Sequence, residues 1–475
     1  MRLFLRNLQK NSKDKKIHIG VLGMARSGLA VAQKALQNGM NVLLSDNKIR
    51  ENFQNIEQIE NLAKNYESSL KIEFGGHTEK LFNMDCLVVS PGIPLNIPFL
   101  LKAKEKNIPL ISEIEFAFQF THPDTKIIAI TGSNGKSTTA SLIHHLLKSQ
   151  GFDTILAGNI GEAYSCFDIE NKKDFIVLEV SSFQLELIND FKPDVALILN
   201  ITPDHLDRYK SFDDYALAKF NIFKNQDFQN IKILNFTDIT SKNIIKKIEQ
   251  YSDMEFVFFA NLDSLEGNDE YPTLMKGGYL QEKKIYINNI EIVSDTDILP
   301  LKGPHNMQNI LAALLAVSPY IDLSTIYKNL CDFKPLEHRL ESVVTLKGVE
   351  YINDSKATNT ESVKKALLSF DKPIHLILGG YDKGEDFYVL TDYMMGKVKN
   401  LYLIGNTAIK MKEIFQEKFD CEVFLSFEKA IFRTFEKAHE GEVVLLSPAC
   451  ASYDWFLNFE ERGKIFKELI NGYNK

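Results

Sequence analysis

A glycine-rich turn between an apolar strand and a helix constrains the fold of this 475-residue chain more than any other feature. Apolar residues at 126–130 predict the strand, and periodic apolar residues at 137–149 predict the helix. Glycines let backbone N–H groups surround anionic oxygens at the positive end of the helix dipole. The turn consists of Gly132, Ser133, Asn134, Gly135, Lys136, Ser137 and Thr138. This combination predicts a nucleotide-phosphate loop on an α/β sheet, with ATP and Mg²⁺ as ligands.

Two side chains of this loop have specific chemistry. Lys136 can reach the terminal phosphates, and the hydroxyl of Ser137 can bind Mg²⁺. Ile130 stands where the standard phosphate-loop pattern has its first glycine, so the loop is the shorter G-x-x-G-K-S. An ordinary glycine turn is the alternative, but the flanking strand and helix favour the phosphate loop.

The length and the repeated alternation of strands and helices predict an α/β fold with three domains and mainly parallel sheets. The predicted domains are 1–112, 113–335 and 336–475. The predicted strands lie at 17–22, 41–45, 86–89, 126–130, 175–178, 195–201, 349–352, 374–378, 400–404 and 442–446. Further helices are predicted at 28–38 and 306–317. Between 228 and 299 the pattern is weak, with short strand-like stretches at 256–259 and 284–287.

Two polar residues follow neighbouring predicted strands of the central region. Glu179 comes directly after strand 175–178, and His205 follows strand 195–201. Because the carboxyl ends of parallel strands face one crevice, both side chains could meet Ser137 there. Glu179 would supply an oxygen ligand for Mg²⁺, and His205 would bind metal or hold a water. A helix cap or a salt-bridge partner is the alternative for a carboxylate at this position.

The N-terminal turn half-matches a dinucleotide-binding fingerprint. Gly20 lies in the first predicted strand, Gly23 and Gly28 follow it, and Asp46 closes the second. The spacing is stretched, so the turn predicts only a nucleotide or phosphate, and a structural glycine turn is the alternative. An NAD-dependent dehydrogenase built on this unit would leave the central loop unexplained.

Polar loops follow two predicted strands of the third region. The first loop covers 353–359 and the second, which is rich in glycine, covers 379–384. Both resemble binding loops, although a simple glycine turn would also explain the second.

The composition excludes several classes of protein. The net charge is −8 and the lysine pairs do not gather into a basic stripe, so no nucleic-acid partner is expected. Five cysteines without a C-x-x-C spacing argue against a disulfide framework or a zinc site. No run of about 18 apolar residues is present, so no membrane insertion is expected. We expect a cytoplasmic protein that acts as a monomer.

Several strings of the sequence together resemble the Mur ligase family, and within it the branch that adds D-glutamate. They are GMARSGLA, SPGIP, GSNGKST, LEVSSFQLE, NITPDHLDRY, GPHNMQN, EHRLE, NDSKATN and SPACASYDWFLNFEERG. GSNGKST is shared with folylpolyglutamate synthases, whereas the strings near the two ends indicate the branch. The resemblance implies a Rossmann-like N-terminal domain that holds UDP, a central P-loop-type ATPase domain and a Rossmann-like C-terminal domain that brings the amino acid.

Matched motif by motif, the resemblance implies four sets of site residues. The UDP-linked substrate would be held by Ser27, Asp46, Ser90, Pro91, Gly92 and Asn159. ATP would be held by residues 132–138 together with Asn309, Arg339 and Asp354. D-glutamate would be held by Thr358, Lys383, Ser452, Tyr453 and Phe459. The catalytic residues would be Lys136, His205 and Lys219, and the metal ligands would be Ser137, Glu179, His205 and Lys219.

Two of these positions carry conditions. The family lysine at the position of Lys219 carries a carbamate, which requires a neutral amine and CO₂. Tyr453 stands where some relatives have leucine; because a backbone contact is expected there, the change implies no change in specificity.

The implied activity is ATP-dependent joining of D-glutamate to UDP-N-acetylmuramoyl-L-alanine through an acyl phosphate, in cytoplasmic peptidoglycan precursor synthesis. Both substrates are small molecules. Another Mur ligase or a folylpolyglutamate synthase-like ligase is the nearest alternative. A P-loop nucleotide switch that is not a ligase is the alternative from a different class.

Overall fold

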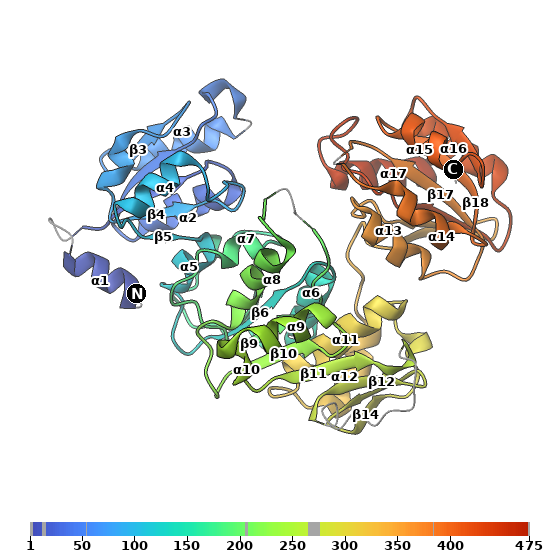
Figure 1. Ribbon diagram of the computed structural model, residues 1–475, viewed down its shortest axis with the longest axis horizontal. Helices are drawn as coiled ribbons and strands as arrows, with labels where there is room; N and C mark the ends of the chain where they lie inside the picture. The colour runs from blue at the N-terminus through green and yellow to red at the C-terminus, as the bar shows by residue number, and fades with distance from the viewer. Residues whose placement is uncertain are drawn as a thin grey trace. The chain divides into compact units, whose positions relative to one another are not determined.

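The computed structural model describes residues 3–11, 16–53, 55–204, 208–264, 276–382 and 384–473. The chain forms two compact units (Figure 1). The first unit contains Met1–Thr296 and Gln308–Asn329, and the second contains Asp297–Met307 and Leu330–Lys475. The first unit holds two sheets and the second holds one. Within the described ranges, no helix is long and apolar enough to cross a membrane.

The N-terminal sheet is wholly parallel, in the order β3-β2-β1-β4-β5. Helix α2 packs on one face and α4 on the other, which explains why the strands are apolar on both faces. The strands are β1 (His18–Leu22), β2 (Asn41–Ser45), β3 (Leu70–Glu73), β4 (Cys86–Val89) and β5 (Leu110–Ile111). The helices are α1 (Leu3–Asn11), α2 (Arg26–Gln37), α3 (Ile56–Asn65) and α4 (Pro98–Glu105).

The central sheet has nine strands in the order β14-β13-β12-β11-β10-β9-β6-β8-β7 and is parallel from β7 to β12. Its first strands are β6 (Lys126–Thr131), β7 (Thr154–Gly158), β8 (Phe175–Glu179), β9 (Val195–Ile198), β10 (Ile231–Asn235) and β11 (Val257–Asn261). The helices are α5 (Glu113–Phe118), α6 (Lys136–Ser149), α7 (Ser182–Leu185), α8 (Phe212–Phe220), α9 (Ile239–Lys247), α10 (Glu249–Ser252), α11 (Pro304–Val317) and α12 (Ile326–Cys331).

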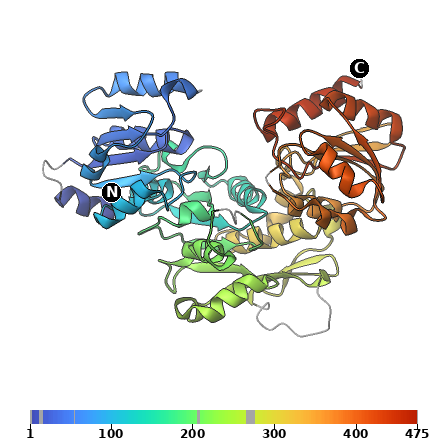
Figure 2. The same ribbon diagram turned by 45° about the horizontal axis from the view of Figure 1, so that its top comes forward.

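One edge of the central sheet is an antiparallel meander (Figure 2). It consists of β12 (Gly278–Gln281), β13 (Lys284–Ile287) and β14 (Ile290–Val293). Each of the two turns has two residues at positive φ, and none of the four is a glycine. They are Glu282 and Lys283 in the first turn and Asn288 and Asn289 in the second. Asparagine tolerates this conformation, but glutamate and lysine rarely adopt it. The first turn is therefore hard to recognise from sequence.

The sheet of the second unit has the order β15-β16-β20-β17-β18-β19, and only β15 is antiparallel to its neighbour. Helices α13, α14 and α15 pack on one face, and α16 and α17 on the other. The strands are β15 (Glu341–Leu346), β16 (Val349–Asn353), β17 (Ile374–Gly379), β18 (Val398–Ile404), β19 (Asp420–Val423) and β20 (Val443–Leu446). The helices are α13 (Thr360–Leu367), α14 (Thr391–Met394), α15 (Ala408–Phe415), α16 (Phe427–Lys437) and α17 (Phe459–Tyr473).

The predicted α/β class with mainly parallel sheets is confirmed. The strand predicted at 195–201 is too long, because β9 ends at Ile198. Beyond that point, Asn200 leaves the strand pairing and its side chain bonds to the neighbouring phosphate loop. The predicted boundaries at 112 and 335 stay predictions.

Candidate active site

The phosphate loop joins β6 to α6, and its two glycines are required by close contacts. Gly132 has φ 150° and Gly135 has φ 88°, conformations that favour glycine. A Cβ on Gly135 would lie 2.3 Å from Oδ1 of Asn309, and one on Gly132 would lie 3.2 Å from Cβ of Leu199. The loop and Asn309, on α11, are therefore packed against each other.

Asn200 fixes the shape of this loop, a role that the sequence did not reveal. Its side-chain Oδ1 accepts from the N–H of Asn134 at 2.9 Å, and its Nδ2 donates to the Asn134 carbonyl at 3.0 Å. Its carbonyl also accepts from the N–H of Ser133 at 2.9 Å. A polar residue inside the otherwise apolar predicted strand 195–201 was the available signal.

The side-chain nitrogens of two lysines meet at the start of the loop. Lys136 Nζ donates to the carbonyls of Gly132 and Ser133 at 2.8 and 2.9 Å, and Lys219 Nζ donates to Gly132 at 3.0 Å. The structure thus brings together two residues that lie far apart in the sequence. The positive charge of Lys136 suits an anionic ligand such as the phosphates of ATP.

Lys219 is the more unusual of the two because it is only 2% exposed. It lies in α8, with Nζ 4.5 Å from the centre of the Tyr215 ring. Burial, and then the charge of Lys136, hold the pKa of Lys219 well below its usual value, while Asp204 and Glu179 oppose this shift. The side chain therefore loses its proton far more readily than an exposed lysine.

Glu179 ends β8 and presents an oxygen that suits a metal. It is 2% exposed, and its Oε1 accepts from Asn159 Nδ2 at 3.0 Å. Its buried Oε2 has no hydrogen-bond partner in the described part of the chain. A Cβ on Gly158 would lie 2.3 Å from the Glu179 carbonyl, so glycine allows the Asn159 loop to approach.

The remaining predicted metal ligands differ in how the structure places them. Ser137 is buried in the first turn of α6. His205 lies outside the described residues. Within the described ranges, no three His, Cys, Asp or Glu side chains form a group that could hold a metal. Glu179 and Ser137 fit Mg²⁺ as oxygen ligands, but they need further anionic ligands.

The turns of the N-terminal sheet place Ser90 beside the first glycine turn. Ser90 Oγ is buried and has no hydrogen-bond partner among the described residues, and a Cβ on Gly23 would lie 2.6 Å from it. A Cβ on Gly28 would lie 1.8 Å from the Gly23 carbonyl. Ser27 lies in the first turn of α2 next to this contact, and Pro91 and Gly92 continue the turn after β4.

The Asp46 carboxylate accepts hydrogen bonds from the backbone around it. Its Oδ2 accepts from the N–H of Met24 and its Oδ1 from the N–H of Lys48, at 2.8 and 2.9 Å. The carboxylate therefore ties the glycine turn to the end of β2, and only its remaining lone pairs could bind a ligand.

Asp354 and Arg339 lie in the second unit at adjoining turns. Asp354 is buried: its Oδ2 accepts from Ser447 Oγ at 2.7 Å, and its Oδ1 accepts from the N–H of Leu340 at 3.2 Å. Burial raises the pKa of Asp354 to about 7. Arg339 is half-buried between two residues with positive φ, His338 and Leu340.

A buried arginine organises the predicted D-glutamate loops. Arg462, on α17, is 1% exposed and donates to Ser355 Oγ and Ser355 O at 3.0 and 2.8 Å. It also donates to the carbonyls of Cys450 at 3.2 Å and Ala451 at 3.4 Å. Arg462 stands one and two helical turns before Phe466 and Ile470, on the apolar face of α17. That spacing was a signal for a buried arginine.

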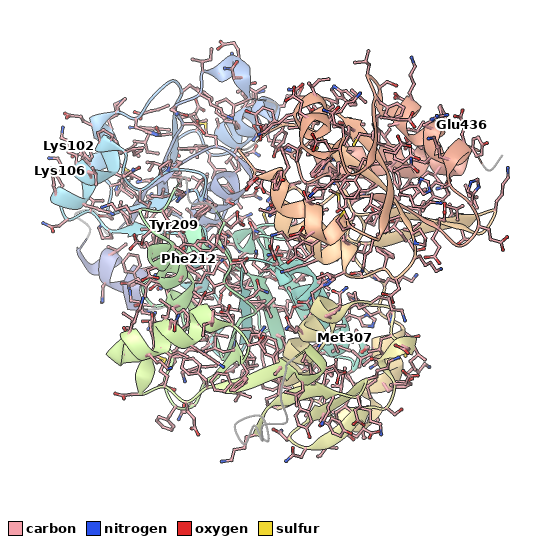
Figure 3. The ribbon with its side chains drawn as sticks, turned by 45° about the vertical axis from the view of Figure 1, so that its right-hand side comes forward. Lys102, Lys106, Tyr209, Phe212, Met307 and Glu436 are labelled. Atoms are coloured by element: carbon pink, nitrogen blue, oxygen red, sulfur yellow. The ribbon has the colours of Figure 1, made fainter. Side chains whose placement is uncertain are left out.

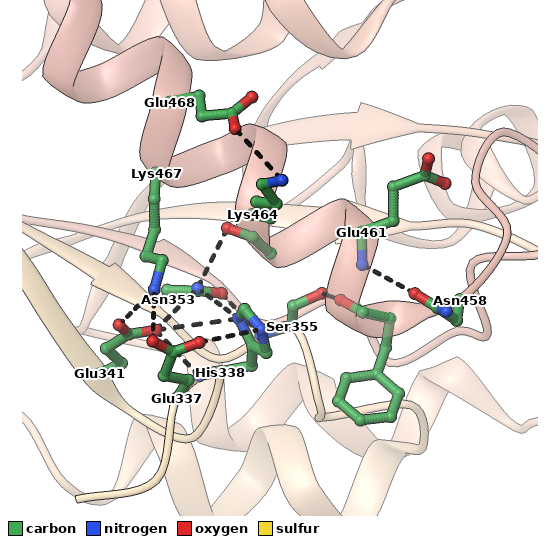
Figure 4. Close-up of polar contacts among 12 residues, drawn as sticks. Glu337, His338, Glu341, Asn353, Ser355, Asn458, Glu461, Lys464, Lys467 and Glu468 are labelled. Carbon is green, nitrogen blue, oxygen red and sulfur yellow. Dashed lines mark hydrogen bonds and ion pairs between the residues drawn. The ribbon is translucent and has the colours of Figure 1, made fainter.

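Four of the predicted D-glutamate residues, Thr358, Ser452, Tyr453 and Phe459, lie on the loops that hold the partners of this arginine or bond to them. Ser355 Oγ donates to the carbonyl of Phe459 at 2.8 Å (Figure 4). Thr358 is half-buried in the loop before α13, and Ser452 is buried. Tyr453 is 69% exposed, and its ring meets that of Tyr381 edge to face at 6.5 Å. Lys383 lies outside the described residues.

Three family models match the chain in succession. The Mur ligase MurD-like N-terminal domain matches residues 17–112, the Mur ligase middle domain matches 130–317, and the Mur ligase glutamate ligase domain matches 338–450.

Curated proteins resemble nearly the whole chain. The UDP-N-acetylmuramoylalanine–D-glutamate ligase of Koribacter versatilis is 41% identical, covering 95% of this chain and 96% of its own. The enzyme of that name from Alkaliphilus oremlandii is 38% identical, covering 97% of this chain and 99% of its own. The solved UDP-N-acetylmuramate-alanine ligase MurC of Thermotoga maritima shares the fold at TM-score 0.58 and 17% identity, covering 96% of this chain and 100% of its own. This chain belongs to the Mur ligase family.

Proposed function

We propose that this protein is an ATP-dependent UDP-N-acetylmuramoylalanine–D-glutamate ligase that acts in cytoplasmic peptidoglycan precursor synthesis as a monomer. The observation that carries the proposal is identity of 36–41% to curated enzymes of that name over nearly the whole chain. The geometry of the phosphate loop and the burial of Lys219 support it.

The proposed chemistry is the activation of a carboxylate. A carboxylate does not react with an amine at neutral pH, because oxide is a prohibitive leaving group. Transfer of the γ-phosphoryl group of ATP to the L-alanine carboxylate gives an acyl phosphate and ADP. The amine of D-glutamate then attacks the acyl carbon, and the tetrahedral intermediate expels phosphate.

The central residues would act on the transferring group. Backbone N–H groups of the loop and the Lys136 ammonium would hold the phosphates, and Asn309 would contact the adenine side. Bound Mg²⁺ would neutralise charge that develops on the phosphoryl oxygens. Glu179 and Ser137 would hold the ion, with His205 as a further predicted ligand. The roles predicted for Arg339 and Asp354 at ATP stay predictions.

Lys219 would complete the metal site as a carbamate. Its neutral amine would attack CO₂, forming an N–C bond and releasing one proton, which converts the neutral side chain into a carboxylate-like anion. Burial and the lowered pKa of Lys219 support this step. Glu179 has one carboxylate oxygen without a hydrogen-bond partner in the described part of the chain, which could bind Mg²⁺. Because the ion needs further oxygen ligands, a carbamate on Lys219 would supply the additional anionic ligand.

The carbamate can be tested without measuring catalysis. Protein equilibrated with ¹³C-labelled bicarbonate should show a carbamate carbon resonance that the Lys219→Ala variant lacks. Lys232 is a matched control: it is also buried, and burial also lowers its pKa. Lys232→Met should keep the resonance. A wild-type protein without the resonance would remove the carbamate from the proposal.

The two remaining substrates would bind at opposite ends of the chain. Ser90 Oγ, Ser27 and Asn159 would contact the UDP-linked substrate, together with Asp46 and the Pro91-Gly92 turn. Thr358, Lys383, Ser452, Tyr453 and Phe459 would surround D-glutamate.

Phosphate release separates this function from its alternatives. Purified protein is incubated with ATP, Mg²⁺ and UDP-N-acetylmuramoyl-L-alanine, and with D-glutamate, L-glutamate, diaminopimelate or no amino acid. Release should depend on D-glutamate. Release without any amino acid would indicate a nucleotide switch, and release that prefers diaminopimelate would indicate another Mur ligase.

A further inference from the structure

Arg208 joins the two sheets of the first unit at the Ser90–Pro94 turn. Its Nη1 donates to the Pro91 carbonyl at 2.5 Å, and its Nη2 donates to the Ile93 carbonyl at 3.2 Å. The same guanidinium lies 3.4 Å from a carboxylate oxygen of Glu186, and the Arg208 side chain is 13% exposed. One planar group thus binds two carbonyls of the turn that carries the orphan hydroxyl of Ser90.

A continuous series of ring contacts leads from Arg208 toward the phosphate loop. The guanidinium carbon lies 3.9 Å from the centre of the Phe183 ring, which stacks on Tyr209 at 5.9 Å. Tyr209 in turn meets Tyr215 edge to face at 5.3 Å. Figure 3 labels Tyr209 and also Phe212, whose ring contacts Tyr215 as well.

The series ends on the phosphate loop itself. Tyr215 Oη lies 3.0 Å from Ser133 Oγ. Ser133 Oγ donates to the Thr202 carbonyl at 2.9 Å and accepts from the Thr202 N–H at 3.0 Å. Since the Ser133 hydrogen is used on Thr202, the hydroxyl of Tyr215 is the donor to Ser133. The Tyr215 ring also lies against Lys219.

We propose that Arg208 is a positioning residue that sets the Ser90–Pro94 turn, and with it the UDP-linked substrate, relative to the phosphate loop. The inference rests on the proposed function. Acyl phosphate formation requires the alanine carboxylate to lie in line with the γ-phosphate, so an error of about 1 Å between the two sites is costly. Arg208 meets that requirement because it bonds to the Ser90–Pro94 turn and also stacks on Phe183, the first ring of the series that leads to the phosphate loop.

Arginine suits this role better than lysine. Its planar fork can donate to two carbonyls while its face stacks on a ring, and both interactions are present here. A lysine would keep the charge but would lose the fork and the stacking. Arg208→Lys is therefore the conservative test, and Arg208→Met removes all the polar contacts.

Lys34 provides a matched control at another contact between the same two sheets. It is buried in α2, and its Nζ donates to the Phe167 carbonyl at 2.8 Å and to Glu170 at 3.0 Å. It contacts neither the Ser90–Pro94 turn nor the aromatic series. Lys34→Met therefore removes a cation from the contact between the sheets without altering the proposed alignment.

Steady-state kinetics separate alignment from general packing. Arg208→Met should raise the KM for UDP-N-acetylmuramoyl-L-alanine by about tenfold or more and lower kcat as well, because the turn that holds this substrate loses the bonds that fix it in line with the γ-phosphate. The dissociation constant for ATP alone should change less than about twofold, because the phosphate loop keeps its own bonds to Asn200. Arg208→Lys should give an intermediate KM, and Lys34→Met a wild-type KM.

Amide hydrogen exchange tests the contact independently of activity. The Ile93 N–H donates to Ser90 O at 3.0 Å within the turn, and its exchange should accelerate in Arg208→Met but not in Lys34→Met. An unchanged KM and unchanged exchange would overturn the inference, and so would equal effects of the Arg208 and Lys34 variants. If Arg208→Met does not fold, Arg208→Lys decides in the same way. If wild-type protein showed no D-glutamate-dependent phosphate release, the proposed function would be wrong. The hydrogen exchange of the Ile93 N–H would then still test whether Arg208 holds the turn.

Discussion

Replacing Arg462 with methionine tests how the second unit holds its two binding loops. The guanidinium is the common partner of Ser355, on the loop after β16, and of the Cys450 and Ala451 carbonyls, on the loop after β20. Burial lowers the pKa of Arg462 to about 10, so the group is still charged at neutral pH. Methionine keeps a long unbranched side chain but removes every donor.

The expected loss follows from the groups left behind. The buried carbonyls of Ser355 and Cys450 lose their partner, and each buried acceptor without a hydrogen bond costs about 1–3 kcal/mol. The Ala451 carbonyl still accepts from the Tyr381 N–H at 2.9 Å. The Ala451 contact, at 3.4 Å, contributes least. Removing a buried cation also removes its desolvation cost, which offsets part of this sum. We expect a net loss of about 3–5 kcal/mol in the free energy of unfolding of the second unit.

Trp455 makes the measurement selective. It is the only tryptophan of the chain and lies in the loop between Ser452 and Phe459, so its fluorescence reports the second unit. With a slope of about 2 kcal/mol per molar urea, the midpoint should fall by about 2 M. The KM for D-glutamate should rise as well, because both loops lose their shared partner.

A surface arginine supplies the control for this experiment. Arg433 pairs with Glu422 and Glu436 at the surface, and Arg433→Met should leave the midpoint unchanged. An Arg462→Met midpoint within about 0.5 M of wild type, or an unchanged KM for D-glutamate, would refute the reasoning.

Three further changes test other parts of the structure. Gly28→Ala would place a Cβ 1.8 Å from the Gly23 carbonyl, so the variant should bind the UDP-linked substrate more weakly. Titration calorimetry measures this affinity, and an unchanged affinity would contradict the packing. Asp354→Asn should raise Tm at pH 8 more than at pH 5. Folding raises the Asp354 pKa from near 4 to about 7, so its ionisation opposes folding increasingly over that range; a difference in Tm that does not vary with pH would count against this. Tyr215→Phe removes the donor to Ser133 and should lower kcat about threefold to tenfold at unchanged KM for D-glutamate, and wild-type kcat would argue against the contact.

Local patterns in the sequence were sufficient for most of the sheets. Strands of parallel α/β sheets are buried on both faces, so β1, β4, β6, β8 and β20 are continuous apolar runs that stand out from their surroundings. Edge strands are half exposed, and their pattern is weaker. The sequence therefore did not identify the edge strands β3, β5, β7, β14, β15 and β19, and it also missed β10 and β12 inside the central sheet.

The positions of Glu179 and Lys136 also followed from the sequence. Both depend on a local rule: ligands bind at the carboxyl ends of parallel strands, and a glycine loop that begins a helix binds phosphate. Each rule requires only the strand or helix next to the residue, so the sequence determined the nature of this site.

Only the tertiary structure decided which distant residues complete that site. Asn200 shapes the phosphate loop, Arg462 joins two loops, and Arg208 links the Ser90–Pro94 turn to the aromatic rings. Each of these residues bonds to a partner more than 60 residues away in the sequence. Hydrogen bonds to backbone carbonyls leave no pattern in the partner's side chain, because every residue offers a carbonyl. The sequence thus determined that this chain carries a phosphate loop on an α/β sheet, and the packing of its loops decided which distant side chains hold that loop and its neighbours in place.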